Sequence, residues 1–211
     1  MRESRGILTV VSGFSGAGKG TIMNELLRCY PDCYALSISA TTRKPRPYER
    51  EGVEYFFKTE EEFCRMIADG ELIEYAQYVG NYYGTPRDYV ERQLEAGVDV
   101  ILEIEIQGAL KIKRDRPDTI LLFITPPTAA ELGRRLAGRG TESAEVIRSR
   151  LMRALSEAEG VDAYDYLVVN DVVEDCVRKV HSIIQNEHSR MHRNLSMIER
   201  LQRELEEFVQ E

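Results

Sequence analysis

The sequence predicts an α/β protein whose core is a parallel β-sheet flanked by helices, and three observations support this prediction. Short apolar runs recur along the chain, helix-like patterns separate them, and a glycine-rich loop directly follows the first run. Strands that alternate with helices usually build a parallel sheet with helices on its faces. The expected strands are residues 7–11, 34–39, 98–106, 120–124 and 166–169, with helices expected at 22–27 and 128–136.

Length and composition limit the classes of protein to consider. The chain has 211 residues, which suits one main domain, and 43% of them are hydrophobic while 30% are charged. No apolar run approaches the roughly eighteen residues of a membrane span, and the N-terminal residues lead into a strand without a signal-peptide pattern. The net charge of −8 disfavours nucleic acid and anionic lipid as partners. We therefore expect a cytoplasmic protein with no membrane and no nucleic-acid partner.

The strongest motif lies directly after the first expected strand and before the first expected helix. This is the context of a P-loop, in which glycines let backbone N–H groups converge on phosphate oxygens and a lysine adds positive charge. An incidental glycine turn would not also supply the strand, the spacing, the lysine and the helix. The expected phosphate-binding residues are Gly13, Phe14, Ser15, Gly16, Ala17, Gly18, Lys19, Gly20 and Thr21.

One position of this motif departs from the common pattern. Most P-loops place Ser or Thr directly after the lysine to bind Mg²⁺, whereas this chain has Gly20 followed by Thr21. Glycine has no side-chain oxygen, so Gly20 cannot bind the metal through a side chain. We expect Mg²⁺ to be held mainly by ATP oxygens and water, with Thr21 as the candidate protein ligand.

Two further segments differ in composition and residue pattern from the alternating strands and helices of the core. Residues 41–90 combine a Pro/Arg-rich turn, short aromatic strands and a helix-like stretch at 59–69, and they predict an inserted subdomain. Residues 138–150 place Arg139 between two glycines before an Arg-rich helix, which is typical of a mobile lid.

Together these motifs resemble the guanylate kinase family along residues 6 to about 186. The resemblance rests on the P-loop, on Ser37 to Pro47, on Glu51 to Phe57, and on three shorter motifs: Ile73-Glu74-Tyr75, Asn81-Tyr82-Tyr83-Gly84 and Arg139-Gly140-Thr141-Glu142. It implies transfer of the γ-phosphoryl group of ATP to GMP in purine nucleotide metabolism. It also implies a P-loop core at 6–40 and 91–186, a GMP-binding insert at 41–90, a lid at 138–150 and an extension at 187–211.

The insert carries the residues expected to hold GMP. An ionised monophosphate needs several cationic or hydroxyl donors from different segments, and the family positions that supply them match Arg43, Arg46, Tyr55 and Tyr83. The Glu74 carboxylate can accept from guanine N1–H and the 2-amino group, neither of which adenine has there. By similarity, Ser39 and Thr85 contact the oxygen edge of guanine. Taken alone, the basic turn and Glu74 would more often be solvated surface groups.

The remaining candidates surround the expected transfer site. Glu103 and Glu105 share one face of the predicted strand by its two-residue period. The resemblance places both among the GMP-binding residues, where acidic groups help to organise magnesium, the P-loop lysine or the acceptor phosphate, and a structural role in orienting Arg or Lys fits either one equally. The resemblance assigns Arg135, Arg139 and Arg150 to ATP binding and charge stabilisation. It places Asn170 near adenine, with a strand-end turn as the alternative. The expected catalytic residues are Lys19, Arg43, Arg139 and Arg150.

The last residues form a separate pattern. Met191, Leu195, Ile198, Leu201 and Leu205 recur at helical spacing, as does Phe208 further on, and they predict an amphipathic helix. This helix packs on its own domain or forms a short dimer contact, so we expect a monomer or a homodimer.

Two other functions are compatible with this architecture. One is a kinase for another nucleoside monophosphate such as AMP or dTMP, and the other is a non-catalytic module that binds phosphorylated peptides. Glu74 disfavours AMP, and the complete P-loop with Lys19 disfavours a module without triphosphate chemistry.

Overall fold

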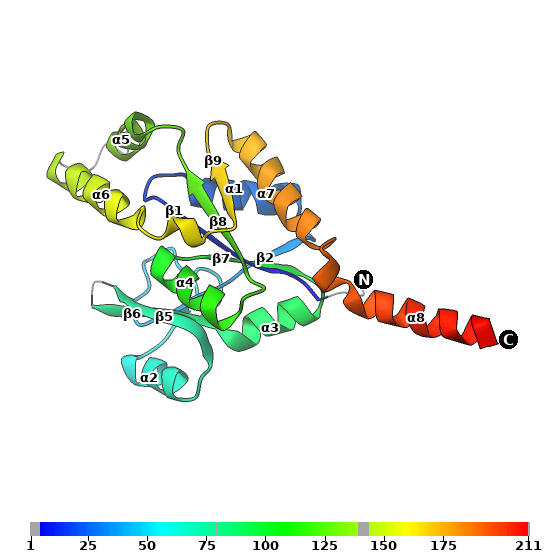
Figure 1. The fold of residues 1–211 in the computed structure, drawn as a ribbon. Helices are drawn as coiled ribbons and strands as arrows, with labels where there is room; N and C mark the ends of the chain where they lie inside the picture. The colour runs from blue at the N-terminus through cyan, green and yellow to red at the C-terminus, as the bar shows by residue number, and fades with distance from the viewer. Residues whose placement is uncertain (1–4, 79, 139–143, 211) are drawn as a thin grey trace.

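A five-stranded sheet occupies the centre of the described chain, and all its neighbouring strands are parallel (Figure 1). The computed structural model describes residues 5–78, 80–138 and 144–210. In spatial order the strands are β2 (Tyr34–Leu36), β7 (Asp99–Glu103), β1 (Leu8–Gly13), β8 (Ile120–Thr125) and β9 (Tyr166–Val169). The predicted fold class is therefore confirmed.

Helices cover both faces of this sheet because its buried strands are apolar on both sides. On one face, α1 (Lys19–Cys29) and α7 (Val173–Glu187) pack against side chains of alternate strand positions. On the other face, α3 (Arg87–Glu95) and α4 (Ile106–Asp115) pack against the intervening positions. The first face presents Val11, Ile101 and Leu122, and the second presents Val10, Leu102 and Leu121.

A second, mixed sheet is built from residues between β2 and α3 (Figure 1). Its spatial order is β4 (Phe56–Phe57), β3 (Ala40–Thr41), β6 (Asn81–Pro86) and β5 (Leu72–Tyr78). The helix α2 (Glu60–Ala68) covers it through the buried ring of Phe63, which stacks on Tyr82. Thr59 and Glu62 form a reciprocal capping box that starts this helix where the sequence predicts it.

The helices α5 (Ala129–Ala137) and α6 (Ala144–Glu157) form a small cluster of their own beside the P-loop. Leu132, Leu136 and Ala154 are buried there, and Phe14 of the P-loop packs against them. Thr128 caps α5 by accepting a hydrogen bond from the backbone N–H of Glu131. A short helical turn, η1 (Val161–Ala163), then leads into β9.

Two predicted strands are too long. The second ends at Leu36 instead of residue 39, and the third ends at Glu103 because α4 already begins at Ile106. Ile104 and Ile106 continue the alternation of the strand, but Ile106 also starts a helical stripe with Ala109 and Ile112 that is buried on the sheet. Tertiary burial of that stripe decides where the strand stops, and Glu105 lies outside the strand as the N-cap of α4.

The C-terminal residues form η2 (Met191–Arg193) and α8 (Leu195–Gln210), which extends away from the body (Figure 1). The amphipathic helix is present, and its large apolar side chains are exposed. Among the described residues they do not form part of any buried core cluster, so packing on its own domain is not the arrangement seen. Within the described part of the chain, no helix has the length and apolar character needed to cross a bilayer.

Candidate active site

The P-loop connects the end of β1 to the start of α1 and wraps around the helix N-terminus. Gly16 and Gly18 adopt φ angles of 91° and 87°, which only glycine tolerates readily. A Cβ atom at Gly18 would lie 2.5 Å from the Asn170 amide nitrogen, so this position also needs glycine for space. The loop residues Gly13 and Ser15 and the first residue of α1, Lys19, line one cavity, so the positive end of the α1 dipole borders it, as an anion site requires.

Lys19 lies at the mouth of that loop. Its ammonium group donates hydrogen bonds to the carbonyl oxygens of Gly13 and Phe14, at 2.7 Å and 3.4 Å. Burial lowers the pKa of Lys19, and the nearby carboxylate of Glu103 opposes that shift. Conversely, desolvation raises the pKa of Glu103, and Lys19 opposes it. The strand β7 thus brings an acidic partner to the lysine, as the sequence predicts for Glu103.

A cavity of about 540 Å³ opens over Lys19 and is lined from three directions. The P-loop supplies one wall, the end of β7 with Glu103 and Glu105 supplies the second, and α6 supplies the third. The lining from α6 includes the predicted Arg150 and two residues that sequence reasoning missed, Arg153 and Glu157.

Arg153 connects two walls of this cavity. Its guanidinium forms an ion pair with Glu105 and donates a 2.9 Å hydrogen bond from Nε to Glu157. Glu105 therefore orients a cation from α6, which is one of the two roles that the sequence leaves open for it. Glu157 lies four residues after Arg153 on α6, a spacing that indicates a helical ion pair, but nothing local indicates the contact with Glu105.

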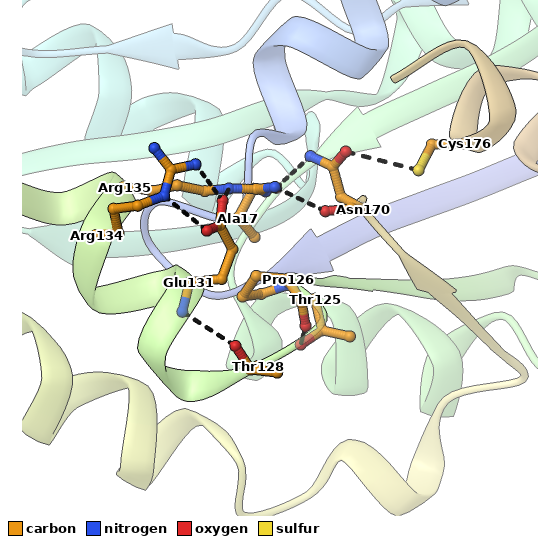
Figure 2. Close-up of polar contacts among 9 residues, drawn as sticks. All are labelled: Ala17, Thr125, Pro126, Thr128, Glu131, Arg134, Arg135, Asn170 and Cys176. Atoms are coloured by element: carbon orange, nitrogen blue, oxygen red, sulfur yellow. Dashed lines mark hydrogen bonds and ion pairs between the residues drawn. The ribbon is translucent and has the colours of Figure 1, made fainter. Parts of the chain in front are cut away.

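The back of the P-loop is held by polar side chains from distant elements (Figure 2). Arg135 of α5 and Asn170 after β9 both point to the carbonyl oxygen of Ala17, at 3.5 Å and 2.6 Å. Arg135 also donates to the Asn170 carbonyl at 2.9 Å, and Glu131 accepts from its Nε. Asn170 is only 3% exposed and its backbone N–H bonds to Thr125. In this structure both side chains support the shape of the P-loop.

The second sheet gathers another cluster, which contains three of the predicted phosphate ligands. The Arg43 guanidinium lies over the Tyr55 ring, 5.3 Å from its centroid, and the Tyr55 and Tyr83 rings meet edge to face. Arg43 also forms a 2.8 Å ion pair with Glu49, which lowers the pKa of that carboxyl. Glu49 accepts a second bond from the Arg46 backbone N–H, whereas the Arg46 side chain is exposed.

Glu74 is a buried carboxylate and is only 6% exposed. It lies on β5, and the hydroxyl of Thr85 on the neighbouring β6 donates to it at 2.8 Å. Burial raises the pKa of Glu74, and the Thr85 hydrogen bond opposes the shift. Gly108 of α4 approaches the carboxylate closely, since a Cβ there would lie 3.2 Å from Oε2. Glu74 and Thr85, two of the predicted GMP-binding residues, are thus brought together in the second sheet.

The protein oxygen atoms available near Lys19 suit a cation such as Mg²⁺ that is bound mainly through the phosphate oxygens of its substrate. Glu103 lines the cavity, whereas Thr21 is exposed in the first turn of α1 and is not one of the lining residues. Among the described residues, no group of three or more His, Cys, Asp or Glu side chains is arranged to hold a metal ion. Mg²⁺ often uses one or two protein oxygens and completes its shell with phosphate and water, so the Glu103 carboxylate at this cavity fits it.

Two predicted residues lie outside these clusters. Ser39 precedes β3, and its carbonyl accepts a hydrogen bond from Phe56. Arg139 lies outside the described residues, as do the Thr and Glu that follow it in the predicted lid motif.

A P-loop at the carboxyl end of a parallel sheet, a half-buried lysine and a facing carboxylate define a P-loop phosphate-binding protein. The comparisons with known proteins identify the family within this class. The family model described as guanylate kinase matches residues 5–187. The chain belongs to the guanylate kinase family.

Individual relatives cover nearly the whole chain. It is 53% identical to a guanylate kinase of Oceanobacillus iheyensis over 92% of this chain and 93% of that protein. It is 48% identical to one of Listeria monocytogenes over 94% and 98% of the two chains. The crystal structure of guanylate kinase from Anaplasma phagocytophilum matches with a TM-score of 0.72 and 34% identity, covering 90% of each chain.

Proposed function

We propose that this protein transfers the γ-phosphoryl group of ATP to GMP and releases ADP and GDP. Membership of the guanylate kinase family supports this activity. The observation that carries the choice of GMP is the buried Glu74 carboxylate, which Thr85 orients in the second sheet. A buried acceptor discriminates strongly, because a base without matching donors leaves it unpaired.

On the donor side, the P-loop and Lys19 bind the phosphates of ATP. Lys19 now donates to two loop carbonyls, and an incoming phosphate offers its ammonium a charged acceptor in their place. Arg135 and Asn170 keep the loop in its phosphate-binding shape through Ala17. The resemblance to the family also supports a direct contact of Arg135, Asn170 and Arg139 with ATP, and this contact is part of the proposal.

On the acceptor side, Arg43, Tyr55 and Tyr83 form the phosphate-binding cluster, joined by Arg46 when GMP binds. The aromatic rings hold Arg43 in place, while its guanidinium retains donors beyond the one that Glu49 accepts. The guanine then lies toward Glu74 and Thr85, with Ser39 at its oxygen edge. This division separates phosphate recognition from base recognition.

In the transfer step, a phosphate oxygen of GMP forms a bond to the γ-phosphorus as the bond to the β-phosphate oxygen breaks. The GMP phosphate is mostly ionised at neutral pH, so its oxygen attacks without a strong protein base. Lys19, Arg43 and Arg150, with Arg139, neutralise charge on the transferring group. Mg²⁺ bound to the ATP oxygens and water would supply further positive charge, and Thr21 and Glu103 would hold it.

The organisation around these residues is proposed on the same basis. The core is residues 6–40 and 91–186, the GMP-binding insert is 41–90, and residues 138–150 form a lid that closes over ATP. The ion pair of Arg153 with Glu105 supports this view of α6, since it links the lid side to the end of β7. We place the enzyme in the cytoplasm, where its substrates are found.

A coupled assay of ADP release tests the function. Purified protein with ATP and Mg²⁺ is given GMP, AMP, dTMP or no acceptor under identical conditions. We expect turnover with GMP to exceed that with AMP by about 10⁴-fold, the discrimination that buried polar sites can reach. Equal turnover with another acceptor would overturn the role of Glu74, and turnover with none would favour a phosphopeptide-binding module.

A further inference from the structure

The strand β5 contains a β-bulge at Glu74. Its pairing with β6 shifts between Leu72 and Tyr75, so two residues of β5 lie opposite one residue of β6. The two are Ile73 and Glu74, and the residue opposite them is Thr85. A bulge breaks the alternation of a strand and re-aims its side chains. Ile73 accordingly packs with buried residues of α3 and α4, and the next residue, Glu74, also reaches α4.

The first turn of α4 meets this carboxylate with a residue that has no side chain. A Cβ atom at Gly108 would lie 3.2 Å from Glu74 Oε2 and 3.7 Å from its Cδ. A separation of 3.2 Å is shorter than ordinary van der Waals contact, so the carboxylate would have to move by a few tenths of an ångström. Thr85 holds the other oxygen, Oε1, at 2.8 Å. The carboxylate is therefore confined between a hydroxyl of β6 and the bare backbone of α4.

One turn further along, α4 also brings positive charge to Glu74. Lys111 follows Gly108 by three residues, which places both on one side of the helix. The Lys111 ammonium lies 4.6 Å from the centroid of the Tyr75 ring, and Tyr75 is the residue after Glu74. Burial raises the pKa of Glu74, whereas the Thr85 hydrogen bond and the charge of Lys111 both oppose that shift. The same helix thus leaves room for the carboxylate and favours its ionised form.

We propose that α4 completes the base-recognition site and that Gly108 is the positioning residue that sets the depth of the Glu74 carboxylate. This inference rests on the proposed function. Guanine offers two donors, N1–H and the 2-amino group, and a paired contact needs both carboxylate oxygens aligned with them. A small displacement of a positioned group weakens such a contact steeply. The base site is therefore shared, since Glu74 and Thr85 come from the second sheet and Gly108 comes from a helix on the five-stranded sheet.

Close helix packing is the other explanation for a glycine at this position. The same Cβ atom would lie 3.2 Å from Ile104 Cδ1, so Gly108 also leaves room for an apolar neighbour. If packing were its only role, a methyl group there would lower stability without changing the choice of base. If Gly108 positions Glu74, the methyl group changes base recognition. The two roles are separable because the Ile104 side chain can be shortened without altering Glu74.

Steady-state kinetics of Gly108→Ala with GMP and with IMP test the positioning role. IMP has the N1–H donor but lacks the 2-amino group, so it uses one carboxylate oxygen where GMP uses two. We expect KM for GMP to rise by about three- to tenfold, with kcat and KM for ATP within about twofold of wild type. The ratio of kcat/KM for GMP to that for IMP should fall. Gly133→Ala, in α5 where a Cβ atom would meet no described atom within 4 Å, is the matched control.

The double variant Gly108→Ala with Ile104→Val separates positioning from packing. Valine lacks the Cδ1 atom that the new methyl group would contact, so the packing clash is removed while the contact with Glu74 stays. We expect KM for GMP to stay raised in the double variant, with Ile104→Val alone as its reference. Recovery of the reference KM would overturn the proposal, as would a Gly108→Ala enzyme that matches Gly133→Ala. A wild-type protein that does not use GMP would instead overturn the proposed function, and this inference with it.

The pH dependence of kcat/KM for GMP tests the charge that α4 supplies. Glu74 accepts from guanine in its ionised form, and Lys111 favours that form. Lys111→Gln should therefore move the acidic limb of the profile to higher pH, since loss of the positive charge raises the pKa of Glu74 further. The ionisation of GMP itself is common to all variants. Arg114→Gln, exposed on the same helix, is the control and should leave the limb in place. Equal profiles for the two variants would contradict the role of α4.

Discussion

The two candidate substrate regions are built in different ways. The P-loop region uses backbone groups, fixed by positive φ angles at Gly16 and Gly18 and by side chains that bond to Ala17. The second sheet uses side chains from separate strands and turns, such as Arg43 and Glu74. A phosphate chain can be held by backbone N–H groups, whereas a base must be recognised by a particular side chain.

This difference has an electrostatic side. Lys19 faces a carboxylate across an open cavity, while Arg43 is already paired with Glu49. The P-loop region around Lys19, called the donor region because it is proposed to bind ATP, can therefore accept an anion directly. The cluster around Arg43 and Glu74 in the second sheet, called the acceptor region because it is proposed to bind GMP, keeps Arg43 paired with Glu49 until substrate binds. Substitutions should consequently affect the two regions to different degrees.

The largest effect is expected at the donor region, from Lys19→Met. Removing this charge should lower kcat by about 10³-fold or more, because Lys19 lies at the mouth of the P-loop and brings its charge to the phosphates of ATP. Burial lowers the pKa of Lys19, so its charged form is disfavoured in the folded state and Met should not lower the thermal midpoint. Steady-state kinetics and thermal unfolding check both statements, and a kcat within tenfold of wild type would contradict the first.

The next effect is expected at the acceptor region, from Glu74→Gln. One carboxylate oxygen becomes an amide donor facing the guanine donors, so kcat/KM for GMP should fall roughly 10- to 100-fold while KM for ATP stays within about twofold. The exposed Glu71→Gln, just before β5, is the matched control. If Glu74→Gln impaired the use of GMP and of ATP equally, Glu74 would not be the residue that recognises the guanine base.

Glu74→Gln should also change how stability depends on pH. Burial raises the pKa of Glu74 in the folded state, so between about pH 4.5 and that raised pKa the folded state binds more protons than the unfolded chain. Stability contributed by this group therefore falls as pH rises through the folded pKa, and the neutral variant lacks this loss. The unfolding midpoint of the variant should equal or exceed that of wild type at pH 7.5. A clearly lower midpoint would mean that ionised Glu74 stabilises the fold.

A smaller effect is expected where α6 meets the donor region. Arg153→Gln and Glu105→Gln should each lower kcat by roughly three- to tenfold, and the double variant should lose no more than either single one, because they remove the same contact. Arg148→Gln, exposed on the same helix, is the control. Additive losses would indicate that the two residues act separately.

The smallest effect is expected from Glu49→Gln at the acceptor region. Glu49 holds Arg43 through one of several donors, so the variant should raise KM for GMP by no more than about fivefold and leave kcat unchanged. A fall in KM would mean that Glu49 competes with the GMP phosphate for Arg43. The ion pair would then hold Arg43 away from substrate and would not preorganise it for binding.

The sequence predicted the donor region better than its surroundings. The P-loop is continuous in the chain, so spacing alone indicates where strand, loop and helix lie. Arg153 was missed because its partner Glu105 lies 48 residues away. The end of β7 was misplaced because Ile106 satisfies both a strand and a helix pattern. The predicted roles of Arg139 and of the lid fall partly outside the described residues and stay predictions.

The α/β class, the P-loop and the amphipathic character of the last helix can be predicted from the sequence, because each depends on periodicity or spacing within a short segment. Three features require the folded structure: the contact of Asn170 with Ala17, the contact of Thr85 with Glu74, and the exposure of the apolar side chains of α8 to solvent. These features depend on burial and on contacts between segments far apart in the chain. Local patterns do not record such contacts, since many pairings satisfy the same pattern and packing selects among them.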